Sequence, residues 1–147
     1  MTAARARRIL IALLLAVAGI AACQLPVLES PDCSSARNSI REFYSFHFGN
    51  DMRPSIEGLD AQKRFLTPEL FNSLVNSLDQ RSDYFTSTVD DYPKAFRVGA
   101  CKSSDAQNAV VEVLLFWKDD NRSEQRSVNV EVVKMEDRWL ISKVTKN

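Results

Sequence analysis

Only one histidine, four glycines and three cysteines occur in this chain of 147 residues. A single imidazole is too few for a multi-histidine metal site, and the glycines form neither a phosphate-binding loop nor a dinucleotide fingerprint. Basic and acidic side chains balance at 19 each, so no excess of positive charge indicates nucleic-acid binding. We therefore expect no metal, no cofactor and no nucleic-acid partner. The remaining composition, 45% hydrophobic and 26% charged, is typical of a globular protein, and the length predicts one domain.

The N-terminus has the pattern of a secretion signal. Arginines at positions 5, 7 and 8 precede an uncharged apolar run over residues 9–20, which is shorter than the roughly 20 residues that span a bilayer. The run ends in Ile20-Ala21-Ala22-Cys23, which resembles the lipobox of bacterial lipoproteins, whose cysteine is lipidated. A plain secretion signal with an incidental cysteine is the alternative. The three features together favour a lipoprotein, with a signal peptide over residues 1–22 and Cys23 carrying diacylglycerol and a palmitate-type acyl chain.

The segment that follows the lipidated cysteine predicts where the domain is held. Residues 23–32 contain Pro26 and Pro31 and no helical period, so we expect a short tether that reaches at most ~30 Å. Gln24 stands where inner-membrane retention signals carry aspartate. By resemblance to Gram-negative sorting, we expect an anchor in the outer membrane of the cell envelope that faces the periplasm. Residues 33–147 then form a single domain.

Two cysteines are left once Cys23 is lipidated. Cys33 and Cys101 are not part of a CxxC motif, so they do not suggest a redox or zinc site. In an oxidising compartment we expect them to form a disulfide with a structural role, and two buried free thiols are the alternative.

The first half of the domain predicts helices. Asp32, Ser34 or Ser35 could cap a helix that ends at Gly49-Asn50. A short helix is expected over residues 56–65, and Thr67-Pro68 starts another that continues to about residue 80. Residues 82–92 are predicted to be a loop, in which Asp90 and Asp91 are expected to be solvated.

The second half predicts four strands, over residues 96–101, 110–118, 127–135 and 138–145. Short connections between them predict an antiparallel meander. Turns centred on Asn121-Arg122 and Glu136-Asp137 would place Val111 opposite Val132, Trp117 opposite Arg126, and Glu112 opposite Glu131. One face of the sheet then forms the core, with Val111, Val113, Leu115, Trp117, Val128, Val130, Val132, Trp139 and Ile141. The other face is mixed, with Glu112, Leu114, Phe116, Asn129, Glu131, Val133, Leu140, Ser142 and Val144, and could contact a second copy in a homodimer.

The last predicted strand carries a family resemblance. In the segment Arg138–Val144, residues Trp139, Ile141 and Val144 match the W-x-I-x-x-V pattern of many bacterial members of the nuclear-transport-factor-2-like superfamily. The resemblance covers residues 33–147. It implies an α+β fold in which N-terminal helices pack on a curved antiparallel β-meander, a cone that often holds a pocket. Members include enzymes and non-catalytic interaction modules, so the fold does not determine the function.

Four side chains are candidates for the lining of such a pocket. His47 lies on the apolar stripe of the first helix with Tyr44 and could act as a general base. A structural histidine is the competing interpretation. Trp117 and Arg126 could line the mouth of the cone or form a cation–π pair. Glu112 and Glu131 are expected to be a solvated pair rather than an acid–base pair.

Two functions follow from these features. We favour a lipid-anchored periplasmic module without catalytic activity, which binds a protein partner or a small ligand. An accessory subunit of an envelope complex and an immunity-type protein are specific versions of it. The alternative is a small enzyme that uses the cone pocket, with His47 as the base and Tyr44 or Arg126 polarising the substrate.

Overall fold

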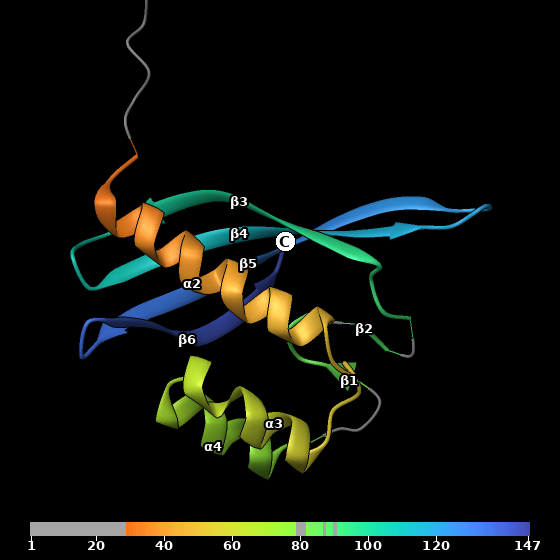
Figure 1. Ribbon diagram of the computed structural model, residues 1–147, viewed down its shortest axis with the longest axis horizontal. Helices are drawn as coiled ribbons and strands as arrows, with labels where there is room; N and C mark the ends of the chain where they lie inside the picture. Colours follow the sequence, from red (N-terminus) through yellow and green to blue (C-terminus); the bar gives the residue numbers. More distant parts are fainter. Residues whose placement is uncertain (1–28, 79–81, 87, 90) are drawn as a thin grey trace, which may run out of the picture.

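The computed structural model of the protein describes residues 29–78, 82–86, 88–89 and 91–147, and shows an α+β fold (Figure 1). The predicted signal peptide (residues 1–22), the lipidated Cys23 and most of the tether lie outside the described residues. Among the residues described, none of the helices is long and apolar enough to cross a membrane.

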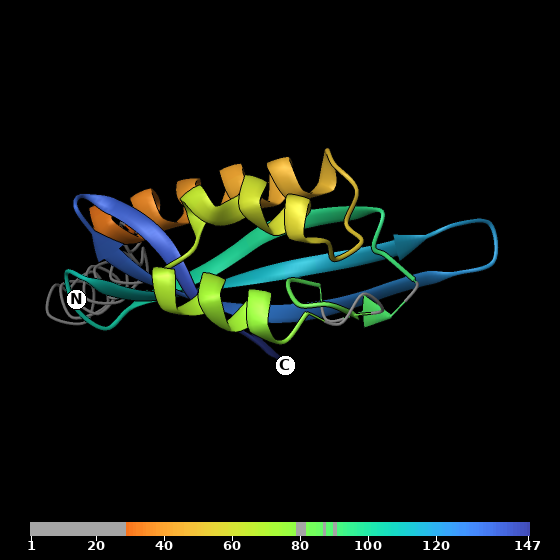
Figure 2. The same ribbon diagram turned by 90° about the horizontal axis from the view of Figure 1, so that it is seen from below.

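A four-stranded antiparallel sheet forms one layer of the molecule. Its strands are β3 (Ala95–Ser103), β4 (Asn108–Lys118), β5 (Ser123–Met135) and β6 (Arg138–Lys146), and they neighbour one another in sequence order as the predicted meander. The β4–β5 hairpin is the longest and projects beyond the helices at one end (Figures 1 and 2).

The helices form the second layer and cover one face of this sheet (Figure 2). They are α2 (Pro31–Phe48), α3 (Ile56–Gln62), the 3-10 helix η1 (Lys63–Phe65) and α4 (Pro68–Asn76). The prediction of the first cap was wrong, because the side chain of Ser30 accepts the hydrogen bond from the Cys33 N–H. Pro31 explains the difference, since its fixed φ favours the first position of a helix and makes the preceding residue the cap. Thr67 caps α4 as predicted, but that helix ends at Asn76 rather than near residue 80.

The predicted loop over residues 82–92 contains a small hairpin. Strand β1 (Ser82–Asp83) pairs antiparallel with β2 (Thr88–Val89) as a separate two-stranded sheet. The side chain of Asp83 binds the main-chain N–H groups of Phe85 and Thr86, which tightens the turn between the two strands.

The core lies between α2 and the helix-facing side of the sheet. It is formed by the aromatic stripe of α2 and the aliphatic residues of β4, β5 and β6, all buried: Ala36, Ile40, Phe43, Tyr44, Val111, Val113, Leu115, Trp117, Val128, Val130, Val132, Trp139 and Ile141. All nine apolar side chains predicted for the core face of the sheet are therefore buried, whereas Arg126, predicted for the same face, is exposed.

The predicted register of β4 and β5 was wrong by two residues. Val111 lies opposite Val130, Trp117 opposite Glu124, and Glu112 opposite Asn129. The turn is centred on Asp120-Asn121, one residue earlier than predicted, because the carboxylate of Asp119 accepts the Asn121 N–H. A shift of two residues leaves every side chain on its predicted face.

The register of β5 and β6 is as predicted near the turn and changes beyond it. Val132 lies opposite Ile141, but a bulge then places Val144 opposite Val130. The extra residue turns Val144 to the core face, where it is buried, so its assignment to the outer face was wrong. The remaining side chains of the mixed face are half-buried, except for Leu140, which is buried.

Candidate functional site

The only histidine is held between two polar side chains beneath the surface. His47, near the end of α2, is 2% exposed. Its Nε2 lies 3.0 Å from Oδ2 of Asp83, and its Nδ1 lies 3.2 Å from Nε2 of Gln62. A carboxylate only accepts hydrogen bonds, so Nε2 carries the proton. In the neutral ring Nδ1 then accepts from the Gln62 amide, and both ring nitrogens are engaged.

Asp83 is buried as deeply as the histidine and is fully hydrogen-bonded. Its carboxylate accepts from His47, from the main-chain N–H groups of Phe85 and Thr86, and from the Thr86 hydroxyl. These bonds fasten the β1–β2 hairpin to α2. Sequence analysis did not identify Asp83 or Gln62 as partners of His47, because they lie 36 and 15 residues away and no motif links them.

Tyr44 lies one helical turn before His47 and is completely buried. Its hydroxyl donates to the carbonyl of Phe85 at 2.9 Å. Burial raises the pKa of Tyr44 well above its usual value, and the carboxylate of Asp83 and the hydroxyl of Tyr84 raise this pKa further. Tyr44 therefore stays protonated and acts as a second fastening between α2 and the β1–β2 turn.

A cavity of about 260 Å³ lies beside this cluster. Side chains from α3, the end of α4 and the β1 turn form its walls, including Leu59, Leu74, Leu78 and Phe85, with His47, Gln62 and Asp83 as the polar part. None of the other three predicted pocket residues, Tyr44, Trp117 and Arg126, lines it. A general base needs a ring nitrogen that faces the substrate. Because both nitrogens of His47 already have partners, this geometry does not favour the enzyme alternative.

Trp117 and Arg126 meet at the start of the projecting β4–β5 hairpin. The guanidinium of Arg126 lies 4.8 Å from the centre of the Trp117 ring, and that of Arg122 lies 5.6 Å from it. Glu124 accepts hydrogen bonds from both arginines, which lowers its pKa. The indole N–H donates to the carbonyl of Asp91. This arrangement matches the cation–π interpretation, although Arg126 is a diagonal rather than a direct cross-strand neighbour.

Glu112 and Glu131, predicted to face each other as a solvated pair, are not paired in the structure. Glu131 lies opposite Lys143 on β6, and their charged groups are 3.4 Å apart. Glu112, opposite Asn129, has its carboxylate near Gly99, where an added Cβ would lie 2.9 Å from the Glu112 Oε2. In the loop, the Asp91 carboxylate pairs with Arg122.

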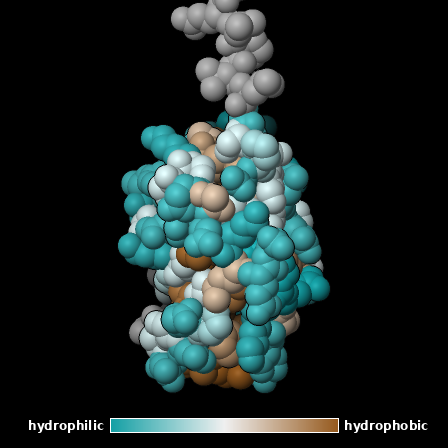
Figure 3. Space-filling model, turned by 90° about the vertical axis from the view of Figure 1, so that its left-hand side faces the viewer, coloured by the Kyte–Doolittle hydropathy of each residue, from teal (hydrophilic) through white to brown (hydrophobic). Residues whose placement is uncertain are grey.

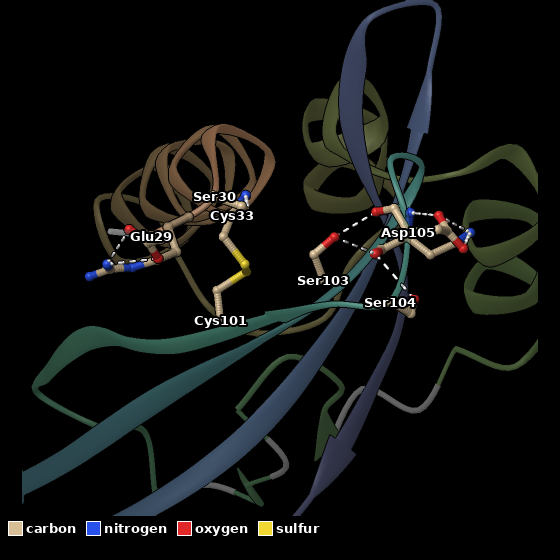
Figure 4. Close-up of a disulfide and its surroundings, with 9 residues drawn as sticks. Glu29, Ser30, Cys33, Cys101, Ser103, Ser104 and Asp105 are labelled. Carbon is tan, nitrogen blue, oxygen red and sulfur yellow. Dashed lines mark hydrogen bonds and ion pairs between the residues drawn. A yellow bond between two sulfur atoms is a disulfide. The ribbon is translucent and has the colours of Figure 1, made fainter. Parts of the chain in front are cut away.

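A disulfide joins Cys33 at the start of α2 to Cys101 on β3, with Cα atoms 5.6 Å apart (Figure 4). The structure thus contains the predicted pairing. Figure 4 also shows Ser103, the last residue of β3, and Ser104 and Asp105 of the β3–β4 turn. Asp105 accepts hydrogen bonds from the main chain of Gln107 and Asn108 and from the side-chain amide of Asn108. These bonds lower the pKa of the exposed Asp105.

Comparison with known proteins identifies the fold. No family model matches the chain, and no curated protein matches it. Among solved structures, it is similar to the Ntf2-like potential transfer protein TraM from the Gram-positive conjugative plasmid pIP501, with 16% identity, a TM-score of 0.51 and coverage of 78% of this chain and 95% of that one. The chain has the nuclear-transport-factor-2-like fold.

Two further structures are similar to this nuclear-transport-factor-2-like domain. One is a chain of the type VI native effector-immunity complex Tae3-Tai3 from Ralstonia pickettii, 21% identical, with a TM-score of 0.58 and coverage of 82% of this chain and 97% of that one. The other is a protein of unknown function from Bacteroides thetaiotaomicron, 24% identical, with a TM-score of 0.53 and coverage of 77% and 90%. At these identities the likeness concerns the fold.

Proposed function

We propose that this protein is a non-catalytic, lipid-anchored module of the bacterial envelope that binds a protein partner, in the manner of an immunity protein. The observation that carries the proposal is the structural similarity to a chain from an effector–immunity complex. The similarity covers 82% of this chain and 97% of that chain. A domain that serves by binding needs no free catalytic group, and the single histidine here is bonded at both nitrogens. The lipobox at Cys23 supports a place at the envelope, where such a partner would arrive.

The experiment is chemical crosslinking of the full-length chain in intact cells of its own host, followed by purification under denaturing conditions and mass spectrometry. We expect one discrete heteromer in the membrane fraction. The control is the Cys23→Ala chain, which should lose the membrane location. A chain that crosslinks only to itself would contradict the proposal and indicate a homodimer through the mixed sheet face. A chain without any crosslinked partner would contradict both interpretations.

A further inference from the structure

A groove runs between the β5–β6 hairpin and the helices, at the end of the molecule that Figure 3 views. It consists of two adjoining hollows, of about 410 Å³ and about 240 Å³. Arg64 of η1 and Arg138 and Leu140 of β6 line both hollows, so the two lie side by side. Figure 3 shows apolar surface in the hollows of this end, between hydrophilic side chains. We call this surface the η1 groove.

The larger hollow of the η1 groove has a mainly apolar lining, and the smaller hollow has a mainly polar one. Phe71 of α4, Leu140 and the 39% exposed Met135 line the larger hollow, and the buried Phe65 and Trp139 line the smaller one. Met135 is one of three large hydrophobic side chains that are exposed in the described part of the chain. A concave surface with an apolar lining and a few polar groups beside it is a common form of binding site.

Three cations line this groove and have no acidic partner among the residues that the structure describes. Lys63 lies 4.8 Å over the ring of Phe71, and the guanidinium of Arg64 lies 4.6 Å from the ring of Phe65. These contacts position the two cations, and the N–H groups of both remain available to a ligand with respect to the described residues. Neither of them, nor Arg138, forms an ion pair within the described residues. The carboxylates that line the groove, Glu42, Glu136 and Asp137, each line only one hollow, whereas the two arginines lie where the hollows join.

The edge of β6 adds main-chain groups to this set. The carbonyl of Ile141 points away from β5 and accepts the N–H of Thr67. Because main-chain direction alternates along a strand, the N–H and C=O of Trp139 point to the same side. Neither has a hydrogen-bond partner among the described residues. The indole N–H of Trp139, whose side chain is 5% exposed, is also unpaired and buried.

These features together define the occupant. We propose that the η1 groove docks an extended segment of the protein partner that carries an acidic side chain next to a large apolar one. The partner's main chain pairs with Trp139, in the short stretch of the β6 edge between the β5–β6 turn and Ile141, where Leu66 and Thr67 already cover the edge. Its carboxylate binds Arg64 and Arg138, and its apolar side chain enters the hollow over Leu140 and Phe71. This inference rests on the proposed function, because the segment belongs to the partner.

The probe is an acetylated hexapeptide of alternating glutamate and leucine, titrated into ¹⁵N-labelled, oxidised residues 29–147, which contain the whole described core. We expect saturable amide shifts over residues 63–72 and 135–142, weakened by added salt. A peptide with lysine in place of glutamate tests the charge, and an N-methylated version with the same side chains tests the main-chain pairing. Each should bind at least about tenfold more weakly.

Paired charge reversals locate the site. The double variant Arg64→Glu, Arg138→Glu should no longer bind the peptide. The control Lys94→Glu, Lys102→Glu changes the net charge by the same amount at exposed positions in and beside β3, and it should still bind. Far-ultraviolet circular dichroism confirms that both variants fold. The proposal is overturned if the glutamate peptide gives no saturable shifts, if the lysine peptide binds equally, or if both double variants lose binding equally.

The same two double variants separate this inference from the proposed function. In the envelope crosslinking experiment, a heteromer that forms equally with either variant would overturn the groove and leave the partner proposal standing. A chain that binds the peptide but yields no crosslinked partner in cells would overturn the proposed function instead.

Discussion

The buried carboxylate of Asp83 receives hydrogen bonds from His47, Phe85 and Thr86. These hydrogen bonds connect α2 to the β1–β2 hairpin, so we assign Asp83 a structural role. Replacing a buried acceptor with a group that also donates leaves some of its donors unpaired.

We therefore expect Asp83→Asn to lower the free energy of unfolding by roughly 2–3 kcal/mol. Urea denaturation followed by circular dichroism measures this loss. The matched control is Asp60→Asn on the exposed side of α3, which should leave the midpoint unchanged. Equal midpoints for all three proteins would contradict the structural role of Asp83.

Tyr44 predicts a specific dependence of stability on pH. Burial raises its pKa in the folded state, so above about pH 10 the unfolded chain loses this proton while the folded protein keeps it. Stability is full below the unfolded pKa and then falls by up to about 1.4 kcal/mol per pH unit.

The measurement compares urea denaturation of the wild type and Tyr44→Phe between about pH 9 and pH 11. The variant should start about 1 kcal/mol less stable, because it lacks the bond to the Phe85 carbonyl. Its stability should then fall less steeply with pH. Parallel curves would show that Tyr44 titrates alike in both states.

At the scale of elements, the two hairpins show which part of the fold the sequence could predict. Alternation of apolar and polar residues determines which face of the sheet each side chain occupies. It does not determine the register, because a shift of two residues leaves every side chain on the same face. The four polar residues from Asp119 to Arg122 offer two neighbouring turn centres, and the Asp119–Asn121 hydrogen bond decides between them. Glu136-Asp137 offers one centre, and the register near it was predicted correctly.

The candidate site was less predictable than the sheet for a related reason. The helical period indicated that His47 faces inward, and this is so. Its partners come from α3 and β1, which reach it only through the packing of separate elements. No local pattern specifies that packing, so the distinction between a structural and a catalytic histidine needed the structure.

The β5–β6 turn contains strain that a substitution should relieve. Glu136 and Asp137 both have positive φ, at 49° and 61°, a conformation that favours glycine. Asp137→Gly should therefore raise the free energy of unfolding by up to about 1 kcal/mol. Thermal denaturation measures the gain. Asp120→Gly is the control, since no positive φ occurs there, and it should bring no gain.

The disulfide should contribute to stability without contributing to localisation. A bridge across 68 residues stabilises the fold by about 4 kcal/mol in the chain-entropy model. The double variant Cys33→Ser, Cys101→Ser should melt at a lower temperature than the wild type and match it under reducing conditions. An unchanged melting temperature would contradict the stabilising role.

At the scale of the whole molecule, anchoring and folding should be separable. The described core lies within residues 29–147, whereas the predicted lipid site is Cys23. Cys23→Ala should move the full-length protein from the membrane fraction to the soluble fraction with an unchanged melting temperature. The disulfide double variant should remain in the membrane fraction. A Cys23→Ala protein that stays with the membrane would overturn the lipid anchor.

The position of the disulfide has a mechanical consequence. The chain enters the described fold just before α2, and Cys33 lies in the first turn of that helix, covalently linked to β3. A pulling force applied from the N-terminal side therefore passes through the sulfur bridge into the sheet. The main-chain hydrogen bonds of α2 are bypassed, so the helix cannot unwind from its first turn under load. If the domain is tethered through its N-terminus and pulled, its helical layer and the η1 groove beside it would therefore stay folded.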